Sequence, residues 1–138
     1  MLTTRRDGRE AALQVLYLKD VSRGGLESVP EAVWADEPLA AKIKEFARHL
    51  EDGVLSHQTA IDELIKKYAE NWEMHRMAAI DRSILRLAAY EILHELGTPI
   101  NVIINEAIEI AKKYSTAESS KFVNGILDKK KLERMTAS

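Results

Sequence analysis

The sequence predicts an all-α protein that folds as a single domain. Apolar residues recur at helical spacing in one segment after another, whereas no segment shows the alternation or the β-branched clustering of a strand between turns. The 138 residues, of which 46% are hydrophobic and 30% charged, have the composition of an ordinary globular domain. We therefore expect one domain over residues 1–138, with six helices readable from the pattern.

The first helix is expected from about Thr4 to Asp20. Its apolar stripe is followed by a stop signal at residues 22–25, SRGG. Gly8 costs roughly 1 kcal/mol relative to Ala in a helix, so we expect the first turn to be loose without a ligand. The stripe consists of Ala12, Leu13 and Leu16.

The second and third helices follow a connection that contains little periodicity. Pro38 suits an early position of the second helix, and Gly53 lies on its inner face, where another backbone could approach closely. Thr59 and Asp62 have the spacing of a capping box for the third helix. The second helix carries Leu39, Ile43, Phe46, Ala47, Leu50 and Val54; the third carries Ile61, Leu64, Ile65 and Tyr68.

The segment Met77–Leu96 is expected to be the most deeply packed helix. It contains no Gly or Pro, and its apolar residues cover much more than half of the helical circumference. Such a helix needs neighbours on several sides. Asp81 and Glu91 lie within the apolar arc, and each therefore needs a partner or an opening to solvent.

Two further helices complete the pattern. Gly97 and Pro99 end the central helix in the expected order, and a fifth helix runs from about Asn101 to Tyr114. Residues 115–118, STAE, offer a capping box for a sixth helix, whose apolar residues are Phe122, Val123, Ile126 and Leu127.

Composition excludes several classes of function. The absence of cysteine excludes disulfides, cysteine–zinc sites and thiol nucleophiles. No apolar run has the length of a membrane span, and the start is not a secretory signal, so we expect a cytoplasmic protein without a membrane partner. The formal net charge is −2, so any binding of RNA or DNA must depend on a local basic patch or on a partner.

Catalysis and cofactor binding have little support in the residue pattern. Glu91 and His94 form a Glu-x-x-His unit of the kind that helical bundles use for two metal ions, but that site needs a second unit and two more glutamates. No second copy exists in the sequence. We expect no metal or other cofactor and no enzymatic activity, with Glu91 structural and His94 on the surface.

The candidate binding residues each have a structural alternative. Guanidinium groups of Arg5, Arg6 and Arg9, which cluster at the start of the first helix, could bind phosphates and stack on bases. They could equally form a solvated turn in which Arg6 pairs with Glu10. Near the sixth helix, Lys121 is a candidate phosphate donor and Phe122 is either a stacking surface or part of the core.

For two further residues the sequence allows either a place inside the protein or a place at an interface. Tyr17 lies at the edge of the first helix's apolar stripe, so it either packs inside or faces a protein partner. Asp81 is either a member of a buried ion pair or an interface carboxylate.

Three blocks of the sequence resemble the NusB family of transcription antitermination factors. They are RRDGREAALQVLY (residues 5–17), AAIDRSILRLAAYEI (residues 78–92) and INEAIEIAKKYSTAESSKFVNGILD (residues 104–128). The last is the most specific, because NEA followed by KFVNGILD at this spacing is hard to obtain by chance. The resemblance extends over nearly the whole chain.

The resemblance implies six to seven helices in two three-helix bundles packed across one another, with subdomains of about 1–70 and 71–138. It implies a non-enzymatic protein that pairs with ribosomal protein NusE and binds the boxA RNA of nascent ribosomal RNA. The pair would act with other Nus factors in the antitermination complex of RNA polymerase. By position, the RNA-facing residues would be Arg5, Arg6, Arg9, Glu118, Lys121 and Phe122, and the NusE-facing residues Tyr17 and Asp81.

Asp7 and Gly8 depart from the sequences of the more basic family members, which indicates weaker RNA binding by the chain alone.

Two other functions compete with antitermination. The first is an RNA-binding accessory domain like that of ribosomal RNA cytosine methyltransferases; since the chain ends soon after Asp128, it would need a separate catalytic chain. The second is a helical protein-binding adaptor, or a homodimer that hides the arginine patch.

Overall fold

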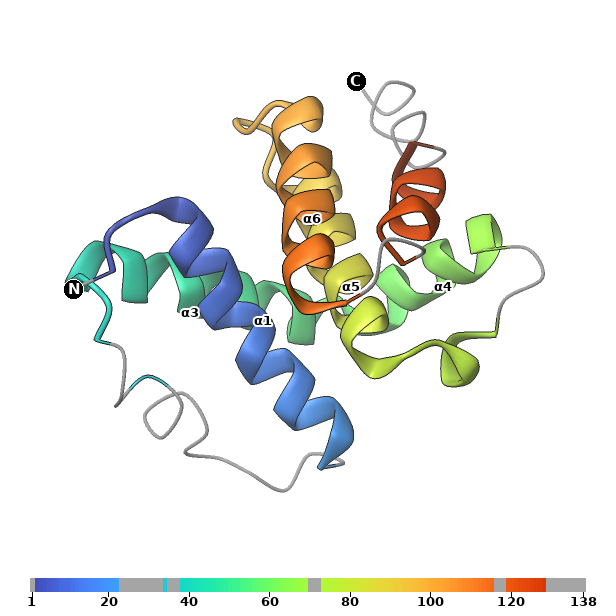
Figure 1. The fold of residues 1–138 in the computed structure, drawn as a ribbon, viewed down its shortest axis with the longest axis horizontal. Helices are drawn as coiled ribbons and strands as arrows, with labels where there is room; N and C mark the ends of the chain where they lie inside the picture. The colour runs from blue at the N-terminus through green and yellow to red at the C-terminus, as the bar shows by residue number, and fades with distance from the viewer. Residues whose placement is uncertain (1, 23–33, 35–37, 70–72, 116–118, 129–138) are drawn as a thin grey trace.

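The computed structural model describes residues 2–22, 34, 38–69, 73–115 and 119–128. Within these ranges the elements are helical, and the one β-type contact is an isolated bridge between Leu2 and Leu39. The all-α prediction is confirmed. The helices, shown in Figure 1, are α1 (Arg5–Val21), α3 (Ala41–Ser56), α4 (Gln58–Ala69), a 3₁₀ turn (Met74–Arg76), α5 (Ala79–His94), α6 (Ile100–Tyr114) and a helix at 119–128.

Helix α5 is the centre of the molecule. It packs against α1, α3, α4 and α6, and it lies behind α6 and between α1 and α4 in Figure 1. Leu87 and Ala89 are both buried, although they lie on nearly opposite sides of the helix. The expectation that this segment is surrounded on several sides is therefore confirmed.

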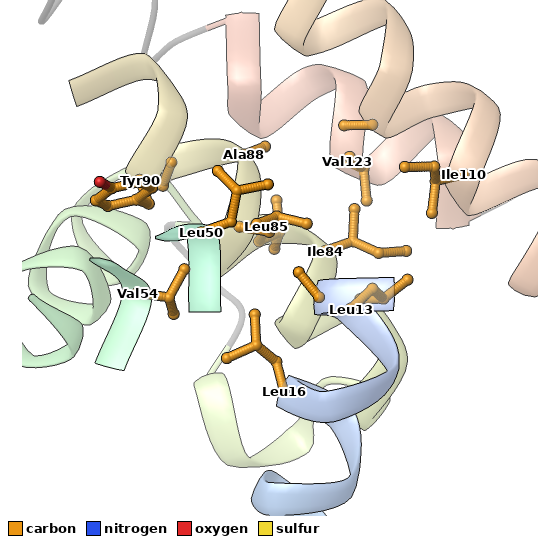
Figure 2. Close-up of a cluster of buried hydrophobic side chains, with 14 of the residues drawn as sticks. Leu13, Leu16, Leu50, Val54, Ile84, Leu85, Ala88, Tyr90, Ile110 and Val123 are labelled. Atoms are coloured by element: carbon orange, nitrogen blue, oxygen red, sulfur yellow. The ribbon is translucent and has the colours of Figure 1, made fainter. Parts of the chain in front are cut away.

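The core is continuous across the helices. Figure 2 shows apolar side chains from α1, α3, α5, α6 and the 119–128 helix gathered in one cluster. Burying each large aliphatic side chain contributes about 1.5–3 kcal/mol to the stability of the fold. Apolar burial in this cluster is therefore the main interaction that holds α1 against α5. The labelled members include Leu13, Leu50, Ile84, Ile110 and Val123.

The first turn of α1 is capped and packed, unlike the loose turn expected from Gly8. The Thr4 hydroxyl accepts from the Asp7 backbone N–H at 3.1 Å, and the Asp7 carboxylate accepts from the Thr4 N–H at 2.9 Å. The Phe46 ring lies directly against Gly8, where an added Cβ would be 2.7 Å from Phe46 Cδ2. The absence of a side chain at Gly8 therefore brings α3 close to α1.

Two local expectations were wrong. Helix α4 begins at Gln58, so Thr59 lies inside it and does not cap it, and Asp62 instead accepts two hydrogen bonds from Arg86, at 2.8 and 2.9 Å. Gly53 makes room for the Tyr90 ring, which an added Cβ would overlap, and not for another backbone.

A partly buried ionic network joins α1, α4 and α5 at the far end of α1. Asp20 accepts from Arg82 at 2.5 Å and from Arg86 at 3.4 Å, while Arg86 also holds Asp62. Arg86 therefore has a structural role. The division of the chain into halves at about residue 70 stays a prediction. None of the described helices is long and apolar enough to cross a membrane.

Candidate nucleic-acid and partner interfaces

Arg5 and Arg6 present exposed guanidinium groups at the start of α1. The Arg5 guanidinium carbon lies 4.5 Å from the centroid of the Phe46 ring. Arg6 Nε donates to Glu106 Oε2 at 2.5 Å, and this hydrogen bond raises the pKa of Arg6. The Arg6 side chain remains 45% exposed, so water competes with the pair and keeps it weak. A phosphate could therefore reach both cations.

Arg9 has a different environment, although it is on the same helix. It is 3% exposed and donates to both oxygens of Glu91, from Nε to Oε2 at 2.9 Å and from Nη2 to Oε1 at 2.9 Å. This pair joins α1 to α5 inside the protein. A ligand could contact the Arg9 guanidinium only by breaking it. The pair also gives Glu91 the structural role expected from its place in the apolar arc.

Glu10 does not bind Arg6, which corrects the alternative considered from the sequence. It accepts from Lys113 Nζ and from Tyr114 Oη, both at 2.6 Å. Burial, followed by the hydrogen bond with Glu10, raises the pKa of the Tyr114 hydroxyl. Helix α1 is thus tied to α6 by Arg6 and by Glu10, one turn apart.

A cavity of about 450 Å³ lies where the start of α5 meets the 119–128 helix. It brings together Lys121 and Phe122, which the sequence had singled out, and adds Arg76 from the 3₁₀ turn. Arg76 was not among the candidate residues identified from the sequence, and only its charge beside the start of α5 could have drawn attention to it. Glu118 lies outside the described residues. The lining consists of Arg76, Met77, Ala78, Asp81, Ser119, Lys121 and Phe122.

Asp81 lines this cavity and is only 6% exposed. Its Oδ2 accepts from Ser119 Oγ at 2.9 Å. Its Oδ1 is buried and has no hydrogen-bond partner among the residues described. A buried acceptor without a donor is unfavourable. A ligand that donated a hydrogen bond to this oxygen would remove that cost.

Tyr17 lies near the opposite end of α1 and is 36% exposed. Val21, one turn further on, is 49% exposed. Residues four apart on a helix share a face, so the two side chains form a small apolar surface, named here the α1 apolar surface.

The histidines do not form a recognisable metal centre. Among the described residues, no group of three or more His, Asp or Glu side chains has the arrangement needed to hold a metal ion. The His94 ring packs against the His57 ring at an interplanar angle of 32°, with 4.2 Å between ring centroids. Burial, with a smaller contribution from His57, lowers the pKa of His94.

Comparisons with known proteins give one consistent result. The model of the NusB family matches residues 6–131. The transcription antitermination protein NusB of Geobacter sulfurreducens is 50% identical over 125 residues, covering 90% of this chain and 91% of the relative. The NusB of Desulfitobacterium hafniense is 48% identical over 129 residues, covering 91% of this chain and 86% of the relative.

Solved structures agree with the sequence comparisons. The NusB of T. maritima superposes with a TM-score of 0.88 at 42% identity, over 99% of each chain. A chain in a crystal structure of antitermination factors NusB and NusE in complex with double-stranded RNA superposes with a TM-score of 0.86 at 25% identity. This match covers 94% of the present chain and 96% of the other.

Proposed function

The chain belongs to the NusB family of transcription antitermination proteins, and we propose that it binds RNA through Arg5, Arg6 and the cavity lined by Lys121 and Phe122. It acts with NusE on the boxA RNA of nascent ribosomal RNA, in a complex with RNA polymerase and other Nus factors. The observation that carries the proposal is a set of exposed cations on a protein of net charge −2. Arg5 and Arg6 supply two of them, and Arg76 and Lys121 beside the cavity supply two more.

The two groups of cations are connected through α6. Arg6 and Glu10 connect α1 to α6, and the contact with Glu10 is made by Lys113 and Tyr114 at the end of α6. Ser119, at the cavity, follows Tyr114 by five residues, a distance of at most about 17 Å for an extended chain. One strand of RNA could therefore contact α1 and then the cavity, where Phe122 offers a ring for base stacking.

The proposed RNA surface carries few cations, so a basic partner would strengthen RNA binding. Phosphate contacts supply much of the affinity of proteins for nucleic acid, and few cations face the ligand here. RNA binding should be weak for the chain alone and stronger with NusE. We assign NusE to the α1 apolar surface, because Tyr17 and Val21 are exposed there and apolar side chains of this kind favour protein contacts.

Arg9 is left out of the proposed RNA surface because its guanidinium is buried against Glu91. We give it a positioning role instead, holding the arginine-bearing end of α1 against α5.

The RNA surface is tested by replacing Arg5 and Arg6 together with alanine. The double variant should bind boxA RNA more weakly, and the slope of log affinity against log salt should fall by about 1.4, since each phosphate contact contributes about 0.7. The measurement is a salt titration with and without NusE. Replacing Lys66 and Lys67 on α4, which removes the same charge elsewhere, should leave the slope unchanged. If the arginine variant kept the wild-type affinity and slope, the assignment would be wrong.

The partner surface is tested by Tyr17→Asp. Docking NusE would then bury a carboxylate without a partner, which is costly, so the affinity for NusE in a calorimetric titration should fall. Val102→Asp places the same charge on α6, at a site that is 43% exposed, and should have no effect. Unchanged NusE affinity of a folded Tyr17 variant would remove Tyr17 from the interface.

A further inference from the structure

Arg82 of α5 joins the last turn of α1 to the 3₁₀ turn. Its Nε and Nη2 donate to Asp20 Oδ2, at 3.0 and 2.5 Å. Its Nη1 donates to the carbonyl oxygens of Met74 and Met77, at 2.8 and 3.4 Å. We infer that Arg82 is a positioning residue that couples NusE binding on α1 to RNA binding beside the 3₁₀ turn. The inference deepens the function proposed above and rests on it.

The first half of this bridge holds the end of α1. Asp20 is three residues from Tyr17 and next to Val21 in the sequence, so it borders the α1 apolar surface to which we assign NusE. The helix dipole opposes a carboxylate near the C-terminal end of a helix, and the bonds from Arg82 offset that effect. A partner that packs on Tyr17 and Val21 restrains this turn and, with it, the oxygen that Arg82 binds.

The second half of the bridge holds the backbone of the 3₁₀ turn. The turn has three residues and contains hydrogen bonds from Arg76 N–H to Glu73 O at 3.0 Å and from Met77 N–H to Met74 O at 3.2 Å. Hydrogen-bond geometry in so short a helix is poor, and the guanidinium adds a stronger, charge-assisted bond to it. Since Arg76 and Met77 line the cavity, Arg82 helps to set where the Arg76 cation meets RNA.

The shape of the guanidinium connects the two halves. The group is planar and rigid, so a displacement of Asp20 turns the whole plane and changes the donation to the two carbonyl oxygens. Only 15% of the Arg82 side chain is exposed, which limits competition from water. Coupling between two sites requires a physical connection that both ligands bias. By linkage, RNA should then strengthen NusE binding by the same factor by which NusE strengthens RNA binding.

Arg86, one turn further along α5, provides the contrast. It donates to Asp20 at 3.4 Å and to the two oxygens of Asp62 at 2.8 and 2.9 Å. These bonds join α5 to α1 and α4, so changing them should affect stability and leave the coupling intact. Arg86 also keeps Asp20 paired when Arg82 is replaced, and an Arg82 variant should therefore fold.

The test uses the full chain and measures its affinity for boxA RNA with and without NusE. Arg82→Met removes all the donors but keeps an unbranched stem, whereas Asp20→Ala removes the acceptor. The two variants change the net charge in opposite directions. Each should nevertheless lower the enhancement of RNA affinity by NusE about fivefold, the lower end of typical couplings between sites. The double variant should lose no more than either single variant, because both changes break one bridge.

A matched control and a second readout separate coupling from stability. Asp62→Ala removes a carboxylate from the same ionic network and should keep the wild-type enhancement. Hydrogen exchange of the Arg76 and Met77 amides, measured without RNA, should become slower when NusE binds the wild type. In Arg82→Met, NusE should leave the exchange of these two amides unchanged.

Each contrary outcome has a separate meaning. If the wild type binds no NusE, or no boxA RNA in the presence of NusE, the proposed function fails and the inference with it. If both bind but Arg82→Met and Asp20→Ala keep the enhancement, the inference alone is overturned. The same holds if NusE does not slow exchange of the two amides in the wild type, a measurement that needs no variant. An equal loss in Asp62→Ala would also overturn it, since lower stability would then explain the effect.

Discussion

Arg6 and Arg9 are three residues apart on α1, and each pairs with a glutamate, but the two pairs differ in solvent exposure and in the number of hydrogen bonds. The Arg6 side chain is 45% exposed and makes one hydrogen bond to Glu106. The Arg9 side chain is 4% exposed and is held by both oxygens of Glu91. Water screens the first pair and leaves its guanidinium available, whereas the second is part of the interior. Two arginines of one cluster therefore have different environments: Arg9 stabilises the fold, whereas Arg6 stays accessible from solvent.

The largest effect that would test this comparison is the loss of Arg9. Arg9→Ala leaves Glu91 as a buried charge without its partner, so the free energy of unfolding should fall by about 3–5 kcal/mol. Urea denaturation measures it. Replacing both residues, as Arg9→Met with Glu91→Leu, should recover most of the loss because no buried charge remains. A loss below 1 kcal/mol for Arg9→Ala would show that the pair is as weak as that of Arg6.

Loss of the capping box formed by Thr4 and Asp7 should have an intermediate effect on the free energy of unfolding. Thr4→Ala removes the hydroxyl that accepts from the Asp7 N–H and should cost about 1 kcal/mol. Hydrogen bonds from Thr4 lower the pKa of Asp7 below its ordinary value. The folded state therefore binds this proton less readily than the unfolded chain, and the contribution of Asp7 is present near neutral pH.

That contribution should decline as the pH falls through about 4, where the unfolded carboxyl titrates, and should be gone below the lowered pKa of the folded state. Urea denaturation between pH 3 and pH 6 would reveal it as a slope that is smaller in Asp7→Asn. Equal slopes in wild type and variant would mean that Asp7 makes no difference to the pH dependence of stability.

The smallest effect on stability should come from breaking the Arg6 pair. Glu106→Gln removes an exposed ionic contact, so the free energy of unfolding should change by less than about 0.5 kcal/mol. Affinity for boxA RNA should rise modestly, because a phosphate no longer competes with Glu106 for Arg6. Glu63→Gln, which removes the same charge at an exposed site of α4, is the control. A stability loss comparable to that of Arg9→Ala would erase the distinction between the two arginines.

The sequence predicted the helices better than it predicted the contacts between them. The apolar arc of α5 indicated burial on several sides, since periodicity records which faces avoid water. It could not show that Glu91 meets Arg9, 82 residues away, or that Glu10 meets Lys113 and not Arg6. Those pairings depend on how the helices pack, and spacing within one helix contains no such information.

The candidate site divides in the same way. The positions of Lys121 and Phe122 near a helix start were readable from the chain, but the cavity they share with Arg76 and Asp81 forms only when the 3₁₀ turn, α5 and the 119–128 helix meet. Burial also separates Arg9 from Arg5 and Arg6, which look equivalent in the sequence.

The 82-residue separation of Arg9 and Glu91 also bears on how the protein is made. A ribosome adds about 5–20 residues per second, so Glu91 is synthesised roughly 4–16 s after Arg9. Throughout that interval α1 has neither its ionic partner nor the apolar surface of α5 to cover Leu13 and Leu16. The N-terminal helix, which we propose binds nascent RNA, therefore reaches its final packing only after the middle of its own nascent polypeptide has been synthesised.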